Sequence, residues 1–154
     1  NDKWLMSVAK KLAVSERVAL LSPVEAADVP ATIRSADVAV APIQDVSLSY
    51  RYCMPNKLFE AAFAGVPICV SDLPEMRRFV ETLGIGCTMD EKDPTAIAKA
   101  ISFVLQNRER YKITSSAFAT LLNVYSWQAQ REKLTELFKA VSVAPSEFRS
   151  TQER

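Results

Sequence analysis

The sequence predicts an α/β fold in which a parallel sheet is covered by helices on both faces. Short apolar runs such as 67–70 (PICV) alternate with amphipathic stretches, which is the pattern of strand–helix–strand units. These runs are continuous, as expected for strands that are buried on both faces. Glycines and prolines separate the segments, and Gly65 and Gly84 are natural helix ends.

The N-terminal third predicts two helices and two strands. Trp4, Val8 and Leu12 recur at helical spacing and indicate an amphipathic helix. Pro30 opposes a single long helix before the next strand, because a proline inside a helix costs ~3 kcal/mol. A short helix capped by Asp28 is expected instead. The expected elements are a helix at 2–13, a strand at 17–22, a helix at 29–34 and a strand at 37–41.

Capping signals delimit the rest of the chain. Asp72 and Glu75 are expected to form a capping box around Pro74, and Asp93 is expected to cap a helix that begins with Pro94. The expected elements are helices at 55–64, 74–83, 94–107, 108–123 and 127–140 (the last capped by Ser126) and strands at 67–70 and 86–89, which makes four strands in all. Residues 1–141 are expected to form one domain, with a flexible tail at 142–154.

Composition excludes several classes of function. A net charge of +1 gives no broad basic face for nucleic acid, and no apolar stretch is long enough to cross a membrane. The chain has no histidine, which excludes histidine-based catalytic triads and histidine-ligated metals. Its three glycines form no glycine-rich phosphate loop. The cysteines at 53, 69 and 87 fit neither a disulfide framework nor a zinc motif, and a reducing cytoplasm is the simplest compartment.

The segment 54–72 (MPNKLFEAAFAGVPICVSD) is the most informative part of the chain. A helix that begins with Pro55, Asn56 and Lys57 offers unpaired backbone N–H groups and a positive dipole to an anion. Lys57 adds a charge suited to phosphate, and Glu60, one turn further on, can accept hydrogen bonds from sugar hydroxyls. A diphosphate next to a ribose would satisfy both groups.

Each of these residues also has a simpler interpretation. Glu60 could be an ordinary surface carboxylate, although the residues around it are almost all apolar and a buried acid needs a partner or a ligand. Lys57 could be a solvated surface lysine, and Asn56 a helix cap. The long segment 43–54 is expected to be a ligand loop, because it follows a strand of the predicted parallel sheet. Arg51, Arg77, Arg78 and Asp45 could add charge to the same edge.

The chain resembles the nucleotide-sugar-binding half of the GT-B glycosyltransferases of the group-1 retaining type. The resemblance rests on SADVAVAP at 35–42, PNKLFEAAFAGVPICVSDLPE at 55–75 and YSW at 125–127, and it covers roughly residues 17–140. It implies a Rossmann-like domain that is one truncated half of a GT-B fold. It also implies a nucleotide-diphosphate sugar as donor, with no cofactor and no metal.

The resemblance suggests roles for individual residues. The glutamate that matches Glu60 holds the ribose hydroxyls of the donor in the family. The family pattern has a second glutamate eight positions earlier, and here that position is Tyr52. Tyr52 and the backbone at Met54 are therefore candidates for contact with the sugar or phosphate, beside Pro55, Asn56 and Lys57. No residue is assigned as catalytic.

The resemblance also implies what the chain lacks. A GT-B enzyme needs a second, N-terminal domain for its acceptor, so the chain is expected to be an inactive fragment of a cytoplasmic protein, or of one held at the inner membrane surface by that domain. Two alternatives stay open: a non-catalytic Rossmann-like binding or interaction module, and a nucleotide-sugar epimerase of the same fold.

Overall fold

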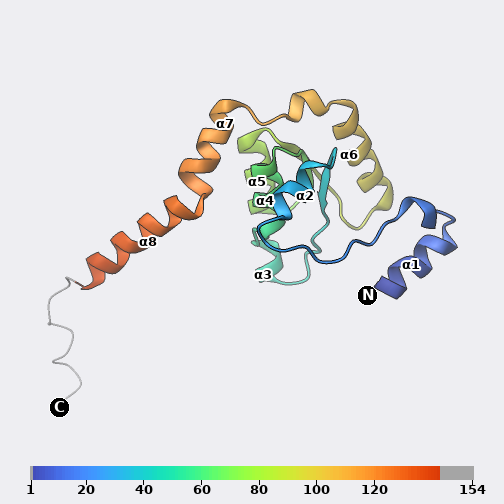
Figure 1. Cartoon of the computed structure of the whole chain (residues 1–154), viewed down its shortest axis with the longest axis horizontal. Coiled ribbons are helices and arrows are strands. Elements are labelled where there is room, and N and C mark those ends of the chain that lie inside the picture. The colour runs from blue at the N-terminus through green and yellow to red at the C-terminus, as the bar shows by residue number, and fades with distance from the viewer. Residues whose placement is uncertain (1, 143–154) are drawn as a thin grey trace, which may run out of the picture.

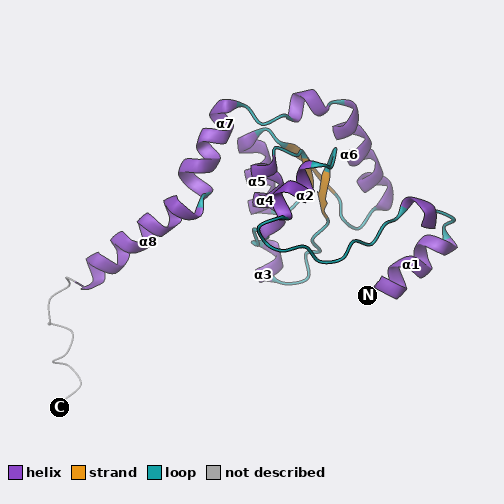
Figure 2. Ribbon diagram, viewed as in Figure 1, coloured by secondary structure: helices purple, strands orange, loops and turns teal. Residues whose placement is uncertain are grey.

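The computed structural model describes residues 2–142 of the chain, and a small parallel sheet lies at its centre (Figure 1, Figure 2). The sheet has three strands in the order β1-β2-β3, and both pairings are parallel. The bounds of the strands are β1 Ala39–Ala41, β2 Ile68–Ser71 and β3 Gly86–Met89. The predicted α/β fold with a parallel sheet is therefore confirmed.

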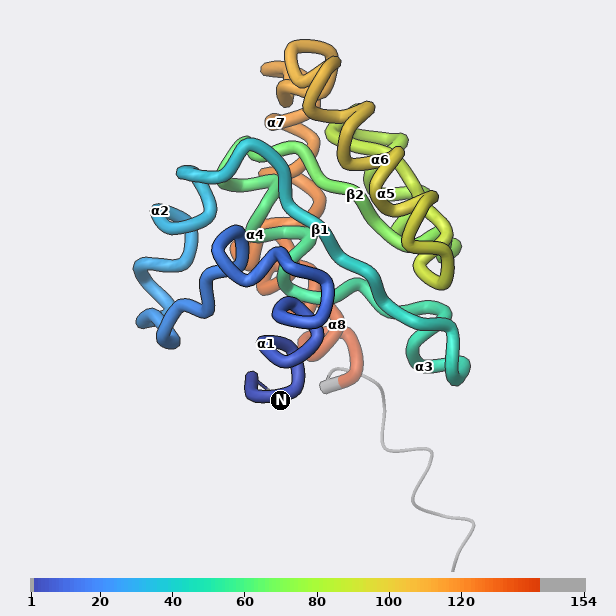
Figure 3. Tube along the Cα trace, turned by 90° about the vertical axis from the view of Figure 1, so that its right-hand side faces the viewer, coloured from blue at the N-terminus to red at the C-terminus, as the bar shows by residue number. Residues whose placement is uncertain are grey.

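Helices cover both faces of the sheet. The crossovers from β1 to β2 and from β2 to β3 pass through α4 (Asn56–Ala64) and α5 (Pro74–Leu83), which lie on one face. The other face is covered by α6 (Pro94–Gln106). Figure 3 views the sheet along the long axis of Figure 1, with α6 toward the viewer and α4 behind the strands.

The alternation of side chains along β2 explains why helices cover both faces of the sheet. Neighbouring residues of a strand point to opposite faces. Ile68 and Val70 pack with α4 and α5, whereas Cys69 packs with Val104 of α6. All four residues of β2 are fully buried, so both faces of the strand need a cover.

The remaining helices lie around this core. Their bounds are α1 Asp2–Lys11, α2 Val29–Arg34, α3 Leu48–Arg51, α7 Ser115–Thr120 and α8 Trp127–Ser142, with short 3₁₀ turns at Ser15–Arg17 and Arg108–Tyr111 and a π-helical turn at Leu121–Tyr125. An aromatic cluster attaches the π-helical turn to the body. The ring of Phe79 lies 5.3 Å from that of Phe59 and 5.0 Å from that of Tyr125.

The two ends of the described chain leave the body on opposite sides (Figure 1). In α1 only Ala9 is buried, and Trp4 is 64% exposed. In α8 a row of large apolar side chains is exposed, consisting of Trp127, Leu134, Leu137, Phe138 and Val141. Residues 143–154 of the predicted tail lie outside the described residues.

The predicted strand at 17–22 is wrong. The backbone at Val18 is extended, but residues 18–22 pair with none of the three strands. Leu20 and Leu21 are 44% and 77% exposed. An apolar sequence becomes a strand only when a neighbouring strand accepts its backbone hydrogen bonds, and no described strand lies beside this segment.

Other predictions hold at the helix ends and fail at some caps. Gly65 and Gly84 end α4 and α5 with φ of 73° and 65°, as expected for a left-handed glycine. Asp93 caps α6 by accepting a hydrogen bond of 2.8 Å from the N–H of Thr95. Ser126 likewise caps α8.

The Asp72–Glu75 capping box is wrong, because both carboxylates pair with arginines of α5 and Leu73 takes the cap position. Asp28 makes no side-chain cap bond.

Two predicted segments differ in detail. The segment 43–54 contains a short helix, α3, whose cap Ser47 accepts a hydrogen bond from the N–H of Tyr50. The single helix predicted at 108–123 is divided, because Thr114 caps a new helix at α7.

Gly86 marks the closest approach between two strands. A Cβ atom at this position would overlap the carbonyl oxygen of Ile68, which is paired with it across the sheet. A side chain here would push β3 away from β2.

Gly86→Ala is therefore expected to lower the free energy of unfolding by about 1–3 kcal/mol through overpacking. Thr88→Ala on the same strand is the matched control and should cost less, since it adds no atom. Urea denaturation followed by circular dichroism measures both. Equal losses for the two variants would contradict the steric argument.

Candidate functional site

The parallel sheet brings strand ends and helix starts together at one edge of the domain, which is a candidate ligand site. Because β1, β2 and β3 are parallel, their carboxyl ends lie at the same edge. The helices α4 and α5 also begin at this edge, since each crosses back from it to the start of the next strand. We call this edge the carboxyl rim. The buried hydroxyl of Ser71 donates a hydrogen bond of 3.4 Å to the carbonyl of Ala41 and ties β1 to β2 there.

The N-terminus of α4 is open. Pro55 takes the cap position with φ of −70° and ψ of 149°, and no side chain caps the helix. Among the described residues, the backbone N–H groups of Asn56 and Lys57 have no hydrogen-bond partner, whereas that of Leu58 bonds to the Pro55 carbonyl at 3.0 Å. Both side chains are exposed. The predicted features of an anion site are therefore present in the backbone.

Glu60 lies one turn further along α4 and is half-buried. Leu58, Ala61 and Ala62 turn into the core, so the helix is anchored on both sides of this residue. The carboxylate has no hydrogen bond or ion pair with any described residue. Its oxygens reach solvent, since the described residues contain no buried side-chain oxygen that lacks a partner. The carboxylate is thus held in place by its helix and left available to a ligand.

The residues before α4 form a short connection from α3. Tyr52 ends α3 and is 56% exposed. Met54 is half-buried and packs against the main core, together with Cys53. One continuous turn and helix therefore contains all six candidate residues, which are Tyr52, Met54, Pro55, Asn56, Lys57 and Glu60.

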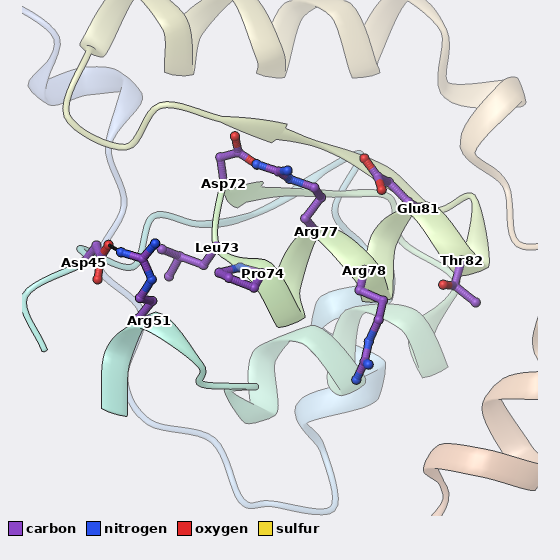
Figure 4. A pocket seen from close by; sticks show the side chains of 9 residues that line it. All are labelled: Asp45, Arg51, Asp72, Leu73, Pro74, Arg77, Arg78, Glu81 and Thr82. Carbon is purple, nitrogen blue, oxygen red and sulfur yellow. Dashed lines mark hydrogen bonds and ion pairs between the residues drawn. The ribbon is translucent and has the colours of Figure 1, made fainter. Parts of the chain in front are cut away.

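A groove lies along the start of α5, with Arg51, the residue before Tyr52, in its wall (Figure 4). It has a volume of about 510 Å³. Its lining consists of Asp45, Arg51, Asp72, Leu73, Pro74, Arg77, Arg78, Glu81 and Thr82. None of the six candidate donor-site residues lines it. The sequence indicates Asp45, Arg51, Arg77 and Arg78 as individual candidates. It does not predict that they line one groove, because only the tertiary fold brings residues 45–51 beside α5.

The three arginines that line the groove each pair with a neighbouring carboxylate. Arg51 bonds to Asp45 at 3.0 Å, Arg77 to Asp72, and Arg78 to Glu75. The hydrogen bond that Arg77 donates to the Asp72 carboxylate raises the pKa of Arg77. Each of these arginines, which could add positive charge to this edge, is therefore already paired with a neighbouring carboxylate. Lys57 forms no ion pair within the described part of the chain.

The described residues show neither a metal site nor a membrane span. No group of three or more Cys, Asp and Glu side chains within residues 2–142 is arranged to hold a metal ion. No helix in this range is both long and apolar enough to cross a membrane.

The fold and the carboxyl rim define an α/β domain with an open helix N-terminus beside a free carboxylate. Residues 1–107 match the family model described as "Glycosyl transferases group 1". The chain belongs to this family.

Curated relatives agree with the family model. The chain is 30% identical over 142 residues to a phosphatidyl-myo-inositol mannosyltransferase of Mycobacterium leprae, which covers 85% of this chain and 34% of the relative. It is 25% identical over 148 residues to a D-inositol 3-phosphate glycosyltransferase of Corynebacterium urealyticum, covering 96% and 33%. The chain thus spans about a third of the length of these relatives.

A solved structure shares the fold. Sucrose-phosphate synthase from Thermosynechococcus elongatus superposes with a TM-score of 0.79 at 17% identity, covering 93% of this chain and 35% of that one. That enzyme is a GT-B glycosyltransferase, and the domain described here has the corresponding fold.

The lack of a partner for Glu60 leads to a prediction about stability. Glu60→Ala is expected to change the free energy of unfolding by no more than about 0.5 kcal/mol, as for a surface residue with no structural contact. Asp93→Ala is the matched control and should cost about 1 kcal/mol, because it removes the cap of α6. Chemical denaturation measures both. A loss for Glu60→Ala as large as that for Asp93→Ala would show that Glu60 is a structural residue.

Proposed function

We propose that this chain binds the donor of a glycosyltransferase that moves a sugar from a nucleoside-diphosphate donor to an acceptor. The observation that carries the proposal is the unpaired, half-buried Glu60 one helical turn from the open N-terminus of α4. A ligand with both an anionic part and adjacent hydroxyl groups fits this combination.

The diphosphate is assigned to the start of α4. The free N–H groups of Asn56 and Lys57 donate to phosphate oxygens, and the Lys57 ammonium supplies the only positive side chain of this turn. Lys57 at a helix N-terminus is unfavourable without an anion, because the dipole is positive there. Pro55 keeps this end open, since it has no side-chain cap group.

Glu60 is assigned to the ribose. Its two carboxylate oxygens accept hydrogen bonds from two neighbouring hydroxyls, and a bond to an ionised acceptor contributes about 1.5–3 kcal/mol. Tyr52 and the backbone at Met54 are assigned to the sugar or to the nearer phosphate, because they immediately precede Pro55.

The chemistry of transfer requires the diphosphate to leave with its electrons. Negative charge then grows on the leaving oxygen, and fixed donors aimed at that position stabilise the transition state. The α4 N-terminus and Lys57 provide this charge stabilisation in the proposal, and no cofactor is invoked.

The acceptor is assigned to a further domain of the same polypeptide. The names of the relatives point to transfer of a sugar to an inositol-containing acceptor in those proteins, and this chain spans only about a third of their length. We therefore expect the 154 residues alone to bind donor without sustained turnover.

Nucleotide binding tests the two assigned roles separately. Calorimetry with UDP, GDP and ADP identifies the preferred base. Glu60→Gln is expected to weaken the tightest of the three at least about tenfold, and Lys57→Ala about three- to tenfold, through loss of charge-assisted hydrogen bonds. Glu109→Gln and Lys99→Ala, exposed positions away from the carboxyl rim, are the matched controls and should leave affinity unchanged.

Ligand analogues make the test more specific. The 2′-deoxy form of the preferred nucleotide should bind wild type more weakly and should lose less further affinity on Glu60→Gln than the parent nucleotide does, because one of the two partner hydroxyls is already gone. The free nucleoside should be insensitive to Lys57→Ala. Nucleotide binding that is indifferent to Glu60, or no binding of any of the three, would favour a non-catalytic interaction module instead.

A further inference from the structure

Two thiols lie side by side in the sheet. Cys69 of β2 and Cys87 of β3 are direct partners in the parallel register, and their Sγ atoms are 4.0 Å apart. Both side chains lie on the face covered by α6. Cys53, the third cysteine, packs in the other core on the opposite face of the sheet.

The two thiols differ in access. Cys69 is fully buried in the central strand, whereas Cys87 is partly exposed, because β3 is an edge strand among the described strands. A reagent in solution therefore meets Cys87 first. The buried Cys69 thiol lies next to it.

Their protonation differs in the same direction. A hydrogen bond from Cys69 lowers the pKa of Cys87 to about 7, while the same bond and burial raise the pKa of Cys69. The accessible thiol is thus the one that forms the nucleophilic thiolate near neutral pH.

The backbone geometry permits a bond between them. Directly opposed residues of neighbouring strands have Cα atoms about 4.7–4.9 Å apart, within the roughly 4.4–6.8 Å that a disulfide spans. The sulfur atoms must approach from 4.0 Å to about 2.05 Å, and rotation of the partly exposed Cys87 side chain supplies this movement.

We propose that Cys69 and Cys87 form a reversible dithiol–disulfide pair, in which Cys87 reacts with an external disulfide and Cys69 resolves the product. The Cys87 thiolate attacks one sulfur of a small-molecule disulfide, forms a mixed disulfide and releases one thiolate. Cys69 loses its proton and attacks Cys87 Sγ, which expels the second thiolate, and the two released thiolates take up from water the two protons that Cys87 and Cys69 have given up. The protein loses two electrons, and the external disulfide is reduced to two thiols.

Oxidation of the folded wild-type chain with glutathione disulfide tests the pair. Two of the three thiols should disappear in a free-thiol assay, and peptide mapping should find a Cys69–Cys87 link. Circular dichroism before and after confirms that the fold persists. A thiol reductant should restore all three thiols.

Single variants separate the two roles. Cys69→Ser keeps a hydrogen-bond donor beside Cys87 but removes the resolving thiol, so it should stop at a persistent glutathione adduct on Cys87, whereas Cys87→Ala should leave Cys69 unmodified. Cys53→Ala is the control and should still form the link. Retention of both thiols in folded wild type, a link that involves Cys53, or an unmodified Cys87 in Cys69→Ser would overturn the proposal.

Discussion

The complete burial of β2 is the constraint on which the rest of the structure depends. Every residue from Ile68 to Ser71 is inaccessible to solvent, so the strand needs a neighbour on each edge and a helix layer on each face. Parallel neighbours in turn need long crossovers, and α4 and α5 provide them on the same face. The return of each crossover places the start of a helix beside the end of a strand. The candidate site is therefore a direct result of how one apolar strand is buried.

Much of this could be read from the sequence where the information is local. The continuous apolar run at β2, the glycines that end α4 and α5, and the Asp93 cap all act within a few residues, and each prediction is confirmed. The predicted strand at 17–22 failed for a non-local reason. Its sequence is as apolar as that of β2, but pairing depends on whether a distant segment lies beside it. The capping box failed because Arg77 and Arg78 compete for the same carboxylates.

The same distinction applies to the candidate site. The residues of α4 were predictable because they share one turn of helix, and the free N–H groups follow from Pro55 at its start. The groove between 45–51 and α5 was not, because its walls come from segments that only the tertiary fold brings together. Nor does composition show that the arginines of this groove are already neutralised. Lys57 of α4, by contrast, forms no ion pair among the described residues.

The aromatic cluster of Phe59, Phe79 and Tyr125 joins the π-helical turn to α4 and α5. Phe59 immediately precedes Glu60, so the ring of Tyr125 helps to set the rotation of α4 about its own axis. A chain cut before Leu121 would keep every residue assigned to the nucleotide and still lose one wall of the helix that carries them. The packing that supports α4 therefore extends to Tyr125, far beyond the residues to which the proposed function assigns the nucleotide.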